Sequence, residues 1–323
     1  MKAMSLFSGC LGFDLGFEKA GIDVVGFCDK STECRETILA NKPKAVVFDD
    51  VFDPKIVAYA KRNKVDVVFG GSPCQSFSTI GNMKFLDDPR GTALLGLVKV
   101  VEQVHPKLFV LENVKGILCK KNESFVQGLI DKFSTIGYKT SLSVLNAADF
   151  GSPQSRNRVF IIGCLDHSAK PVFRQSRIRR KLRDVVDGSD RNPKDCLGFT
   201  TKIATFMDMV PAGGNWKSLP PNLIPEAMGN ANLKSGGLTA YYRRLSYDKP
   251  SPTLVTSPSH KGTTLCHPDF TRPLSLEEYR RIQGFPEKWK LVGSLRHKYE
   301  QLGNAVPLPL AKAVGDAVVR MLQ

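Results

Sequence analysis

Short apolar runs alternate with longer helix-like segments in the first half of the chain, and this alternation restricts the fold more than any other feature. The runs occupy residues 4–7, 24–28, 45–48, 65–69 and 108–111. The expected helices cover residues 13–20, 31–41, a segment opening near 54, a segment after 91, and 124–136. Strands and helices that alternate in this way form a parallel sheet with helices on both faces. The sequence therefore predicts a doubly wound α/β domain.

Two further apolar runs, at 140–145 and 159–164, follow the last of these helices. Gly151 and Pro153 lie in the link between them, which leaves no room for a full helix. We therefore expect an antiparallel, hairpin-like pair at the end of the sheet.

From about residue 170 the sequence changes character. Seven basic residues and no acidic residue lie between 170 and 183, and the stretch onward to 267 is rich in Gly, Pro, Asn and Ser. We expect a second, smaller domain of loops and short strands. Helical patterns return at 276–282 and 309–321, and the last has an apolar stripe that can pack onto the first domain. The stripe consists of Leu310, Ala313, Val314, Ala317, Val318 and Met321.

Charge and cysteine usage narrow the class of protein. The 323 residues carry a formal net charge of +15, and a polyanionic partner is the simplest reason for such an excess, although solubility alone is an alternative. The eight cysteines include no C-x-x-C pair and no Cys/His cluster at zinc spacing, so we expect reduced thiols and no metal site. No apolar run approaches the roughly 20 residues that span a bilayer, which favours a cytoplasmic protein without membrane contact.

Two reactive side chains follow neighbouring expected strands. Cys74 lies in the segment Gly-Gly-Ser-Pro-Cys-Gln-Ser after the run 65–69, and Glu112 begins Glu-Asn-Val after the run 108–111. Open α/β sheets form their sites in the loops beyond the carboxyl ends of strands. A nucleophile and a proton donor are therefore expected to face one pocket.

The start of the chain has the character of a ligand-binding turn. Phe-Ser-Gly-Cys-Leu-Gly at 7–12 joins the first strand to the first helix, where bare backbone and a helix N-terminus can meet a ligand. The pattern departs from G-x-G-x-x-G because Leu11 takes the middle position. Asp29 and Asp50, after the next two strands, can accept hydrogen bonds from hydroxyl groups. These three strand ends predict a nucleoside-like ligand, and a turn needed only for packing is the alternative.

Taken in order, these segments resemble the DNA cytosine-5 methyltransferases, in particular the compact prokaryotic type. The resemblance covers nearly the whole chain: Phe7-Ser8-Gly9 with Gly12, Asp29, Asp50-Val51, Pro73-Cys74-Gln75, Arg90-Gly91, Glu112-Asn113-Val114, the Gln154–Arg158 segment, 272–286 and 303–307. It implies an S-adenosylmethionine-dependent, Rossmann-like doubly wound sheet in residues 1–172, completed by 298–323. It also implies a smaller target-recognition domain in residues 173–297.

Four positions depart from the family pattern. Leu11 replaces a usual glycine, Asp29 a usual glutamate and Ser72 a common phenylalanine, and Asp49 stands where glycine is common. These changes affect how closely the cofactor fits, and none involves Cys74 or Glu112.

The resemblance implies methyl transfer from S-adenosyl-L-methionine to C5 of a cytosine flipped out of duplex DNA. Cys74 would add to C6, because the aromatic ring is otherwise a poor nucleophile. Glu112 would donate a hydrogen bond at N3, which requires a raised pKa and therefore a closed, apolar pocket. Arg156 would orient the cytosine O2, Arg158 is expected to be structural or to face a phosphate, and Asn113 either fixes the loop or is a simple turn residue. No residue presents itself as the base for the C5 proton, so water is the candidate.

The remaining site expectations also come from the resemblance. The cofactor-binding residues would be Phe7, Gly9, Cys10, Leu11, Gly12, Asp29, Lys30, Asp50, Val51, Pro73, Asn304 and Ala305. The DNA-binding residues would be Gln75, Ser76, Ser78, Gly81, Arg158, Arg243, Arg244, Thr253 and Leu254. The partners would be double-stranded DNA and, functionally, a cognate restriction endonuclease.

Four alternatives remain open at the level of sequence. A nicotinamide-dependent oxidoreductase would share the sheet but need the missing glycines. A thiol hydrolase would need a histidine paired with Cys74, and the five histidines show no such pairing. An RNA-directed enzyme of the same family and a catalytically inactive DNA-binding relative would share the motifs.

Overall fold

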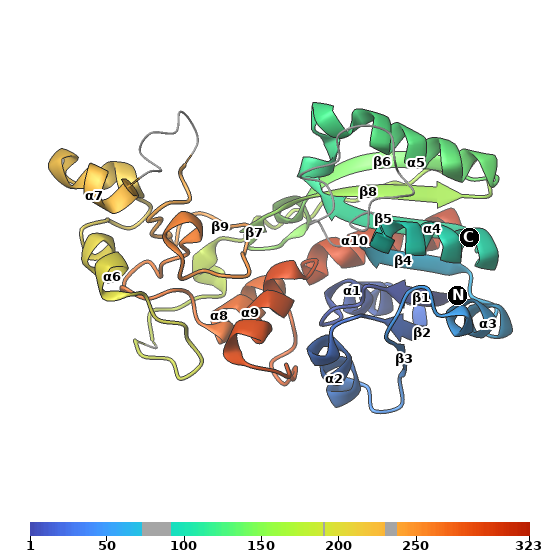
Figure 1. The fold of residues 1–323 in the computed structure, drawn as a ribbon, viewed down its shortest axis with the longest axis horizontal. Coiled ribbons are helices and arrows are strands. Elements are labelled where there is room, and N and C mark those ends of the chain that lie inside the picture. The colour runs from blue at the N-terminus through green and yellow to red at the C-terminus, as the bar shows by residue number, and fades with distance from the viewer. Residues whose placement is uncertain (73–91, 190, 230–237) are drawn as a thin grey trace.

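Two lobes make up the molecule, with helices α8 (Leu276–Gln283) and α9 (Leu295–Asn304) between them (Figure 1). The structure is a computed structural model and describes residues 1–72, 92–189, 191–229 and 238–323. The larger lobe contains a seven-stranded sheet, and the smaller lobe contains mostly loops and short helices.

The large sheet confirms the predicted doubly wound fold. Its strands are β1 (Lys2–Leu6), β2 (Asp23–Cys28), β3 (Val46–Phe48), β4 (Val67–Gly71), β5 (Leu108–Val114), β6 (Lys139–Asn146) and β8 (Asn157–Cys164). They lie in the order β3-β2-β1-β4-β5-β8-β6, and the first five are parallel. β8 runs antiparallel to both β5 and β6, as expected for the end of the sheet.

Helices cover both faces of this sheet. The large lobe contains α1 (Gly12–Lys19), α2 (Thr32–Asn41), α3 (Pro54–Arg62), α4 (Thr92–Val104), α5 (Glu123–Thr135) and α10 (Leu308–Met321). One core forms where α3, α4 and α5 bury apolar side chains against the sheet, and a second where α1, α2 and α10 do so. Side chains fix two of the helix starts, because Ser31 Oγ accepts from Cys34 N and Asp53 Oδ1 accepts from Lys55 N.

The last helix packs back onto the first domain, as its apolar stripe predicted. Leu310, Val314 and Val318 are fully buried in the core that α10 shares with α1. The two helices approach so closely that a Cβ added at Gly16 would lie 2.2 Å from Ala311 Cβ.

The smaller lobe differs from the prediction of loops and short strands. Among its described residues the only strand is the two-residue β9 (Ser251–Pro252), which pairs in parallel with β7 (Gln154–Ser155). Short helices take the place of the expected strands, namely α6 (Thr201–Asp208) and α7 (Ile224–Met228). Thr200 caps α6 by accepting from Ile203 N, and Phe206 and Met207 bury its apolar face. These helices are too short for a clear periodic signal.

Single turns of 3-10 helix connect many of these elements. They are η2 (Lys115–Leu118), η3 (Lys120–Asn122), η4 (Ala147–Phe150), η5 (Leu182–Asp184), η6 (Trp216–Ser218), η7 (Pro221–Leu223) and η9 (Lys261–Thr263). No helix in the described ranges is both long and apolar enough to cross a membrane.

A third core joins the lobes. It contains Cys10 from the turn after β1, Leu254 from the segment after β9, and Tyr279 and Leu302 from α8 and α9. Ser275 and Glu278 form a capping box at the start of α8, and Gly284, at φ +82°, ends it. The turn at the start of the chain is therefore supported by side chains from its far end.

Candidate active site

Glu112 lies within β5 rather than in the loop after it, which corrects the sequence-based placement. Its neighbours across the sheet are Gly71 on β4 and Phe160 on β8. A Cβ at position 71 would come within 2.5 Å of Glu112 Oε2, so only glycine leaves room for the carboxyl group. The end of β4 and the Glu112 side chain therefore meet at one edge of the sheet.

Arg158 holds this carboxyl group from the opposite strand. Its Nε lies 2.7 Å from Glu112 Oε1, and the side chains are 10% and 9% exposed. Burial raises the pKa of Glu112 above that of an ordinary glutamate, and the guanidinium groups of Arg158 and Arg156 oppose the shift. The carboxyl group therefore takes up a proton more readily than an exposed one, and its orientation is fixed.

Arg156 lies elsewhere than the sequence suggested, and Arg158 takes a structural role beside Glu112. Arg156, expected at the cytosine O2, is 1% exposed and donates to the main-chain carbonyls of Leu254, Gly303 and Asn304. Arg158, expected to be structural or to face a phosphate, is the residue that contacts Glu112. Arg156 lies at a break between β7 and β8, where its main-chain N–H donates to Asn146 Oδ1.

Asn113 ties β5 to the point where the chain leaves β4. Its Nδ2 donates to Ser72 Oγ over 2.9 Å, and both residues are buried. This contact supports the loop-fixing role over that of a simple turn residue. The predicted site residues that follow, Pro73, Cys74, Gln75, Ser76, Ser78 and Gly81, lie outside the described residues.

The turn after β1 has an unusual backbone. Phe7 and Leu11 adopt φ values of 57° and 71°, in the left-handed region that residues other than glycine rarely occupy. This conformation explains why the family commonly has glycine where this chain has Leu11. The Leu11 side chain is fully buried, so core packing holds the strained turn in place.

Asp29 anchors this turn from the end of β2. One carboxylate oxygen accepts from Gly9 N over 2.7 Å and the other from Ser31 N over 2.9 Å. A Cβ built at Gly9 would meet no atom within 4 Å, so the backbone there borders open space. A partly buried acceptor beside open backbone fits a ligand with hydroxyl groups, such as the ribose of S-adenosylmethionine.

The other residues predicted to bind a cofactor lie around this turn. Lys30 and Asp50 are exposed, and Asp50 accepts from Phe52 N, whereas Val51 is 9% exposed and packs in the core against α4. A Cβ at Gly12 would lie 3.0 Å from Ala305 Cβ, so the turn between α9 and α10 touches the start of α1.

Cys10 contributes backbone at most to this site. Its side chain is 1% exposed and donates to Gln301 O, and its carbonyl accepts from Trp289 Nε1. Burial raises the pKa of its thiol well above the ordinary range, which makes it unreactive. The Cys10 side chain therefore belongs to the core, and only its backbone stays a predicted cofactor contact.

Comparison with known proteins decides the family. A family model for C-5 cytosine-specific DNA methylases matches residues 1–320. The chain belongs to this family. It is therefore an S-adenosylmethionine-type methyltransferase rather than a nicotinamide oxidoreductase or a thiol hydrolase, which answers two of the alternatives left by the sequence.

Curated relatives match over almost the whole chain. The Type II methyltransferase M.PspPI of Psychrobacter sp. is 37% identical, with 99% of this chain and 79% of the relative covered. The Type II methyltransferase M.Sau96I of Staphylococcus aureus is 34% identical, with 98% and 75% covered.

Solved structures share the fold of this methylase. The Dnmt2 methyltransferase of S. pombe superposes with a TM-score of 0.71 at 18% identity, covering 100% of this chain and 98% of that one. The methyltransferase EhMeth of Entamoeba histolytica gives 0.74 at 15% identity, with 100% and 99% covered.

Two residues predicted to bind DNA lie in the interior of the methylase. Arg244 is 6% exposed and donates to the carbonyls of Met207, Val210 and His267, so its guanidinium group organises the smaller lobe. Leu254 is 1% exposed and belongs to the core between the lobes. Both expectations are corrected, because neither side chain reaches the surface.

Arg243 and Thr253 remain accessible to a partner. Both are partly exposed, and Thr253 Oγ1 donates to Ser155 O. Within the described residues the buried Nε of Arg243 has no hydrogen-bond partner.

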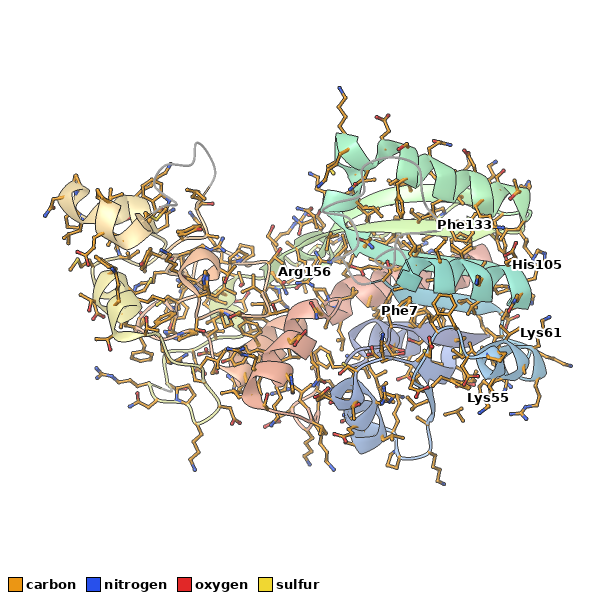
Figure 2. The ribbon with its side chains drawn as sticks, in the orientation of Figure 1. Phe7, Lys55, Lys61, His105, Phe133 and Arg156 are labelled. Atoms are coloured by element: carbon orange, nitrogen blue, oxygen red, sulfur yellow. The ribbon has the colours of Figure 1, made fainter. Side chains whose placement is uncertain are left out.

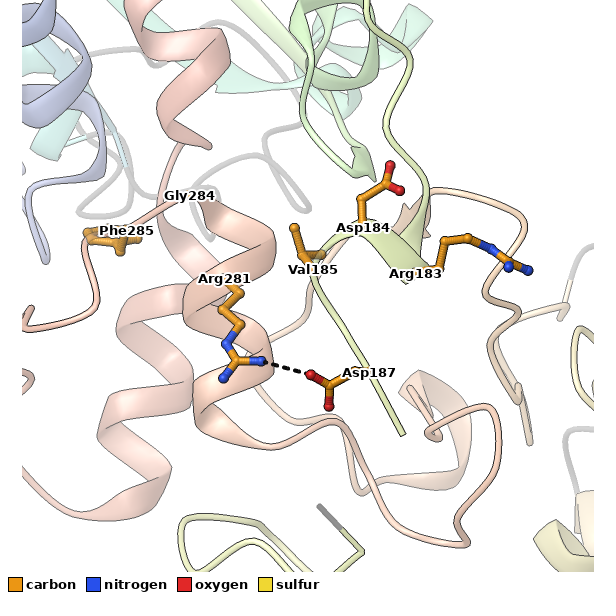
Figure 3. Close-up of a pocket in the computed structure, with 7 residues that line it drawn as sticks. All are labelled: Arg183, Asp184, Val185, Asp187, Arg281, Gly284 and Phe285. Carbon is orange, nitrogen blue, oxygen red and sulfur yellow. Dashed lines mark ion pairs between the residues drawn. The ribbon is translucent and has the colours of Figure 1, made fainter. Parts of the chain in front are cut away.

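A hollow of about 390 Å³ lies between α8 and the segment around η5. Figure 3 shows Arg281 of α8 directed toward Asp187, at 3.9 Å, with Arg183, Asp184, Val185, Gly284 and Phe285 also lining the hollow. Phe285 also lies beside the turn after β1, because a Cβ built at Gly12 would come within 3.3 Å of its Cζ atom. The hollow of the methylase therefore adjoins the turn after β1.

Proposed function

We propose that this chain methylates C5 of a flipped cytosine within a specific duplex DNA sequence, through a covalent bond between Cys74 and C6. The observation that carries the proposal is the buried Glu112, held by Arg158 and packed against the end of β4. Its raised pKa suits an acid that donates to a ring nitrogen. Family membership supports the reaction, and the names of the relatives, Type II methyltransferases, support a role in restriction-modification.

The chemistry follows from what each side chain can supply. The thiolate of Cys74 forms a bond to C6, and the displaced electron pair moves toward C5 and N3. Protonated Glu112 donates a hydrogen bond at N3 and so stabilises the electron-rich ring, while Arg158 fixes the carboxyl group in place. S-adenosylmethionine, when bound, supplies the electrophilic methyl group. Water then takes the C5 proton, and the electron pair of that C–H bond expels Cys74 as thiolate.

For the cofactor we propose the turn after β1 and the strand ends beside it. Asp29 would accept from ribose hydroxyls, and the open backbone at Gly9 would allow close approach. The other proposed cofactor contacts are Phe7, Leu11, Gly12, Lys30, Asp50, Val51, Asn304, Ala305 and, from sequence alone, Pro73.

For DNA we propose a division of labour between the lobes. Residues 1–172 with 298–323 would hold the cofactor and the cytosine, and residues 173–297 would read the sequence. Arg243 and Thr253 are the DNA-contacting candidates among the described residues, and Gln75, Ser76, Ser78 and Gly81 are proposed from sequence alone. A cognate restriction endonuclease would be a functional partner.

Bisulfite sequencing of DNA from a bacterial host that expresses the chain tests the proposal. We expect cytosines protected from conversion within one short sequence, and no such protection in a host that expresses Cys74→Ser. Transfer of labelled methyl groups to tRNA but not to duplex DNA would instead favour the RNA-directed alternative. Cognate duplex binding by the chain without methyl transfer would indicate an inactive relative.

A further inference from the structure

Arg156 sits in a buried junction between the two lobes (Figure 2). Its Nη1 donates to Leu254 O over 3.0 Å, and its Nη2 donates to Gly303 O over 2.8 Å and to Asn304 O over 3.3 Å. No carboxylate among the described residues forms an ion pair with it. Its charge interacts with that of Glu112, but its hydrogen bonds go only to carbonyl groups. Such a guanidinium is costly to desolvate, so its place calls for an explanation beyond packing.

The acceptors belong to two distinct parts of the molecule. Gly303 and Asn304 end α9, so their carbonyl groups have no partner within the helix and lie at its negative end. Leu254 follows β9, in the lobe proposed to read DNA. One planar guanidinium group therefore joins the recognition segment to the turn that carries Asn304 and Ala305.

Two glutamines extend the junction. Gln154 Oε1 accepts from Leu254 N over 3.0 Å, so Gln154 and Arg156 together hold both polar groups of the Leu254 backbone. Gln154 Nε2 donates to Gln283 Oε1 over 3.1 Å, and Gln283 Nε2 donates to Ala305 O over 3.2 Å. Both glutamine side chains are fully buried.

The backbones of the two parts are also in direct contact. A Cβ built at Gly303 would lie 2.8 Å from the carbonyl carbon of Val255, closer than real contacts allow. A shift of residues 254–256 would therefore move the end of α9, because neither hydrogen bonds nor packing leave space for independent motion.

We propose that Arg156 is a positioning residue that couples DNA recognition to cofactor binding by fixing the α9–α10 turn to the recognition segment. The inference rests on the proposed function, since it assumes that residues 251–256 respond to DNA and that Asn304 and Ala305 contact the cofactor. Coupling of this kind is reciprocal, so each ligand raises the affinity for the other by the same factor.

Isothermal titration calorimetry measures that factor as the ratio of the Kd values for S-adenosylhomocysteine without and with a bound duplex. The duplex contains the sequence that bisulfite sequencing shows to be methylated, and a scrambled duplex is the reference. In the wild-type chain we expect the cognate duplex to tighten binding about five-fold or more, within the usual range of coupling. In Arg156→Lys, which keeps the charge but cannot span both acceptors, we expect a factor below about two.

Arg244→Lys provides a matched control. Arg244 is also buried and donates to carbonyl groups, but all of its acceptors lie within the smaller lobe. The Arg244→Lys variant is expected to be less stable than the wild type and to keep the wild-type coupling factor. If Arg156→Lys does not fold, Gln283→Met breaks the second connection to Ala305 and is expected to reduce the factor as well.

The outcomes separate this inference from the proposed function. A wild-type factor near one, or unchanged factors in Arg156→Lys and Gln283→Met, would overturn the coupling while methylation of the duplex still stands. An equal loss of coupling in Arg244→Lys would also overturn it, because any destabilised chain would then behave alike. Absence of a methylated sequence would refute the proposed function itself.

Discussion

Glu112 and Arg158 make up the part of the site whose geometry is described, and their contact predicts how the reaction responds to substitution. In Glu112→Gln the side chain keeps its size and can donate from its amide, but it no longer carries an ionisable proton. We expect kcat to fall about 10²- to 10³-fold, the usual cost of losing an acid in the transition state, with little change in DNA affinity. Labelled methyl transfer and gel-shift titration measure the two quantities. Glu123→Gln, at an exposed position of α5, is the control and should match the wild type in both.

Asp14 yields a second prediction for a single residue. Its side chain is fully buried, and burial raises its pKa from 3.8 to about 7. The folded state therefore keeps a proton that the unfolded state releases above pH 3.8, so stability falls as the pH rises from about 4 to 7. Between pH 5 and 7.5 this group lowers the free energy of unfolding by roughly 2–3 kcal/mol.

Urea denaturation of the wild type and of Asp14→Asn at these two pH values isolates the contribution of Asp14. As the pH rises from 5 to 7.5, the free energy of unfolding of Asp14→Asn should increase relative to that of the wild type by roughly 2–3 kcal/mol. Parallel stability curves would show that the carboxyl group is ionised, or equally protonated, in both states.

Single residues also mark the limit of inference from sequence. The thiol and carboxyl motifs identified the chemistry, but they did not show which of Arg156 and Arg158 faces Glu112. Arg156 lies at the break between β7 and β8, where its main-chain N–H donates to Asn146 Oδ1. A partner ten residues away leaves no periodic signal in the sequence.

At the scale of elements, the contact between α1 and α10 holds the end of the chain on the first domain. Gly16→Ala would place a methyl group 2.2 Å from Ala311 Cβ, and the helices would have to separate. We expect a loss of about 1–3 kcal/mol in the free energy of unfolding, the usual cost of overpacking. Gly128→Ala in α5 is the matched control, since its Cβ would meet nothing within 4 Å and alanine favours a helix by up to about 1 kcal/mol. Thermal unfolding should show a lower melting temperature for Gly16→Ala and an equal or higher one for Gly128→Ala. A stabilised Gly16→Ala would contradict the close packing of α1 and α10.

The elements of the first lobe were predictable because buried parallel strands are continuous apolar runs bounded by glycine and helix caps. The strands β1, β2 and β4 begin and end within two residues of those runs. The helices of the second lobe and the helix α9 between the lobes were not predictable in the same way. Helix α9, with the sequence Leu-Arg-His-Lys-Tyr-Glu-Gln-Leu-Gly-Asn, is mostly polar and is held by contacts with α8 and with the turn after β1. Such a helix depends on tertiary packing rather than on a periodic apolar face.

At the scale of the whole molecule, the two lobes share a core and a net charge of +15. A shared core means that the lobes hold a defined geometry relative to each other before DNA binds. The excess positive charge then governs how strongly, rather than where, the protein associates with a polyanion.

The basic segment 170–183 offers a direct test of that charge. Arg179 and Arg183 form ion pairs with Asp149 and Asp248, whereas Arg174, Arg177 and Arg180 are exposed and form no ion pair among the described residues. If these three arginines neutralise phosphates, replacing all of them with alanine lowers the number of counterions released on DNA binding by up to three. The slope of log Kd against log salt concentration should then flatten by up to about 2.7 units, because each contact contributes about 0.9.

Fluorescence anisotropy with a labelled duplex between 50 and 200 mM salt measures that slope, at concentrations over which phosphate contacts dominate affinity. The sequence that is methylated should stay the same, since phosphate contacts carry no sequence information. The control is Arg179→Ala, whose charge is already balanced by Asp149 and whose loss should change the slope by less than about one unit. An unchanged slope in the triple variant would place the duplex away from this segment and leave its charge to serve solubility alone.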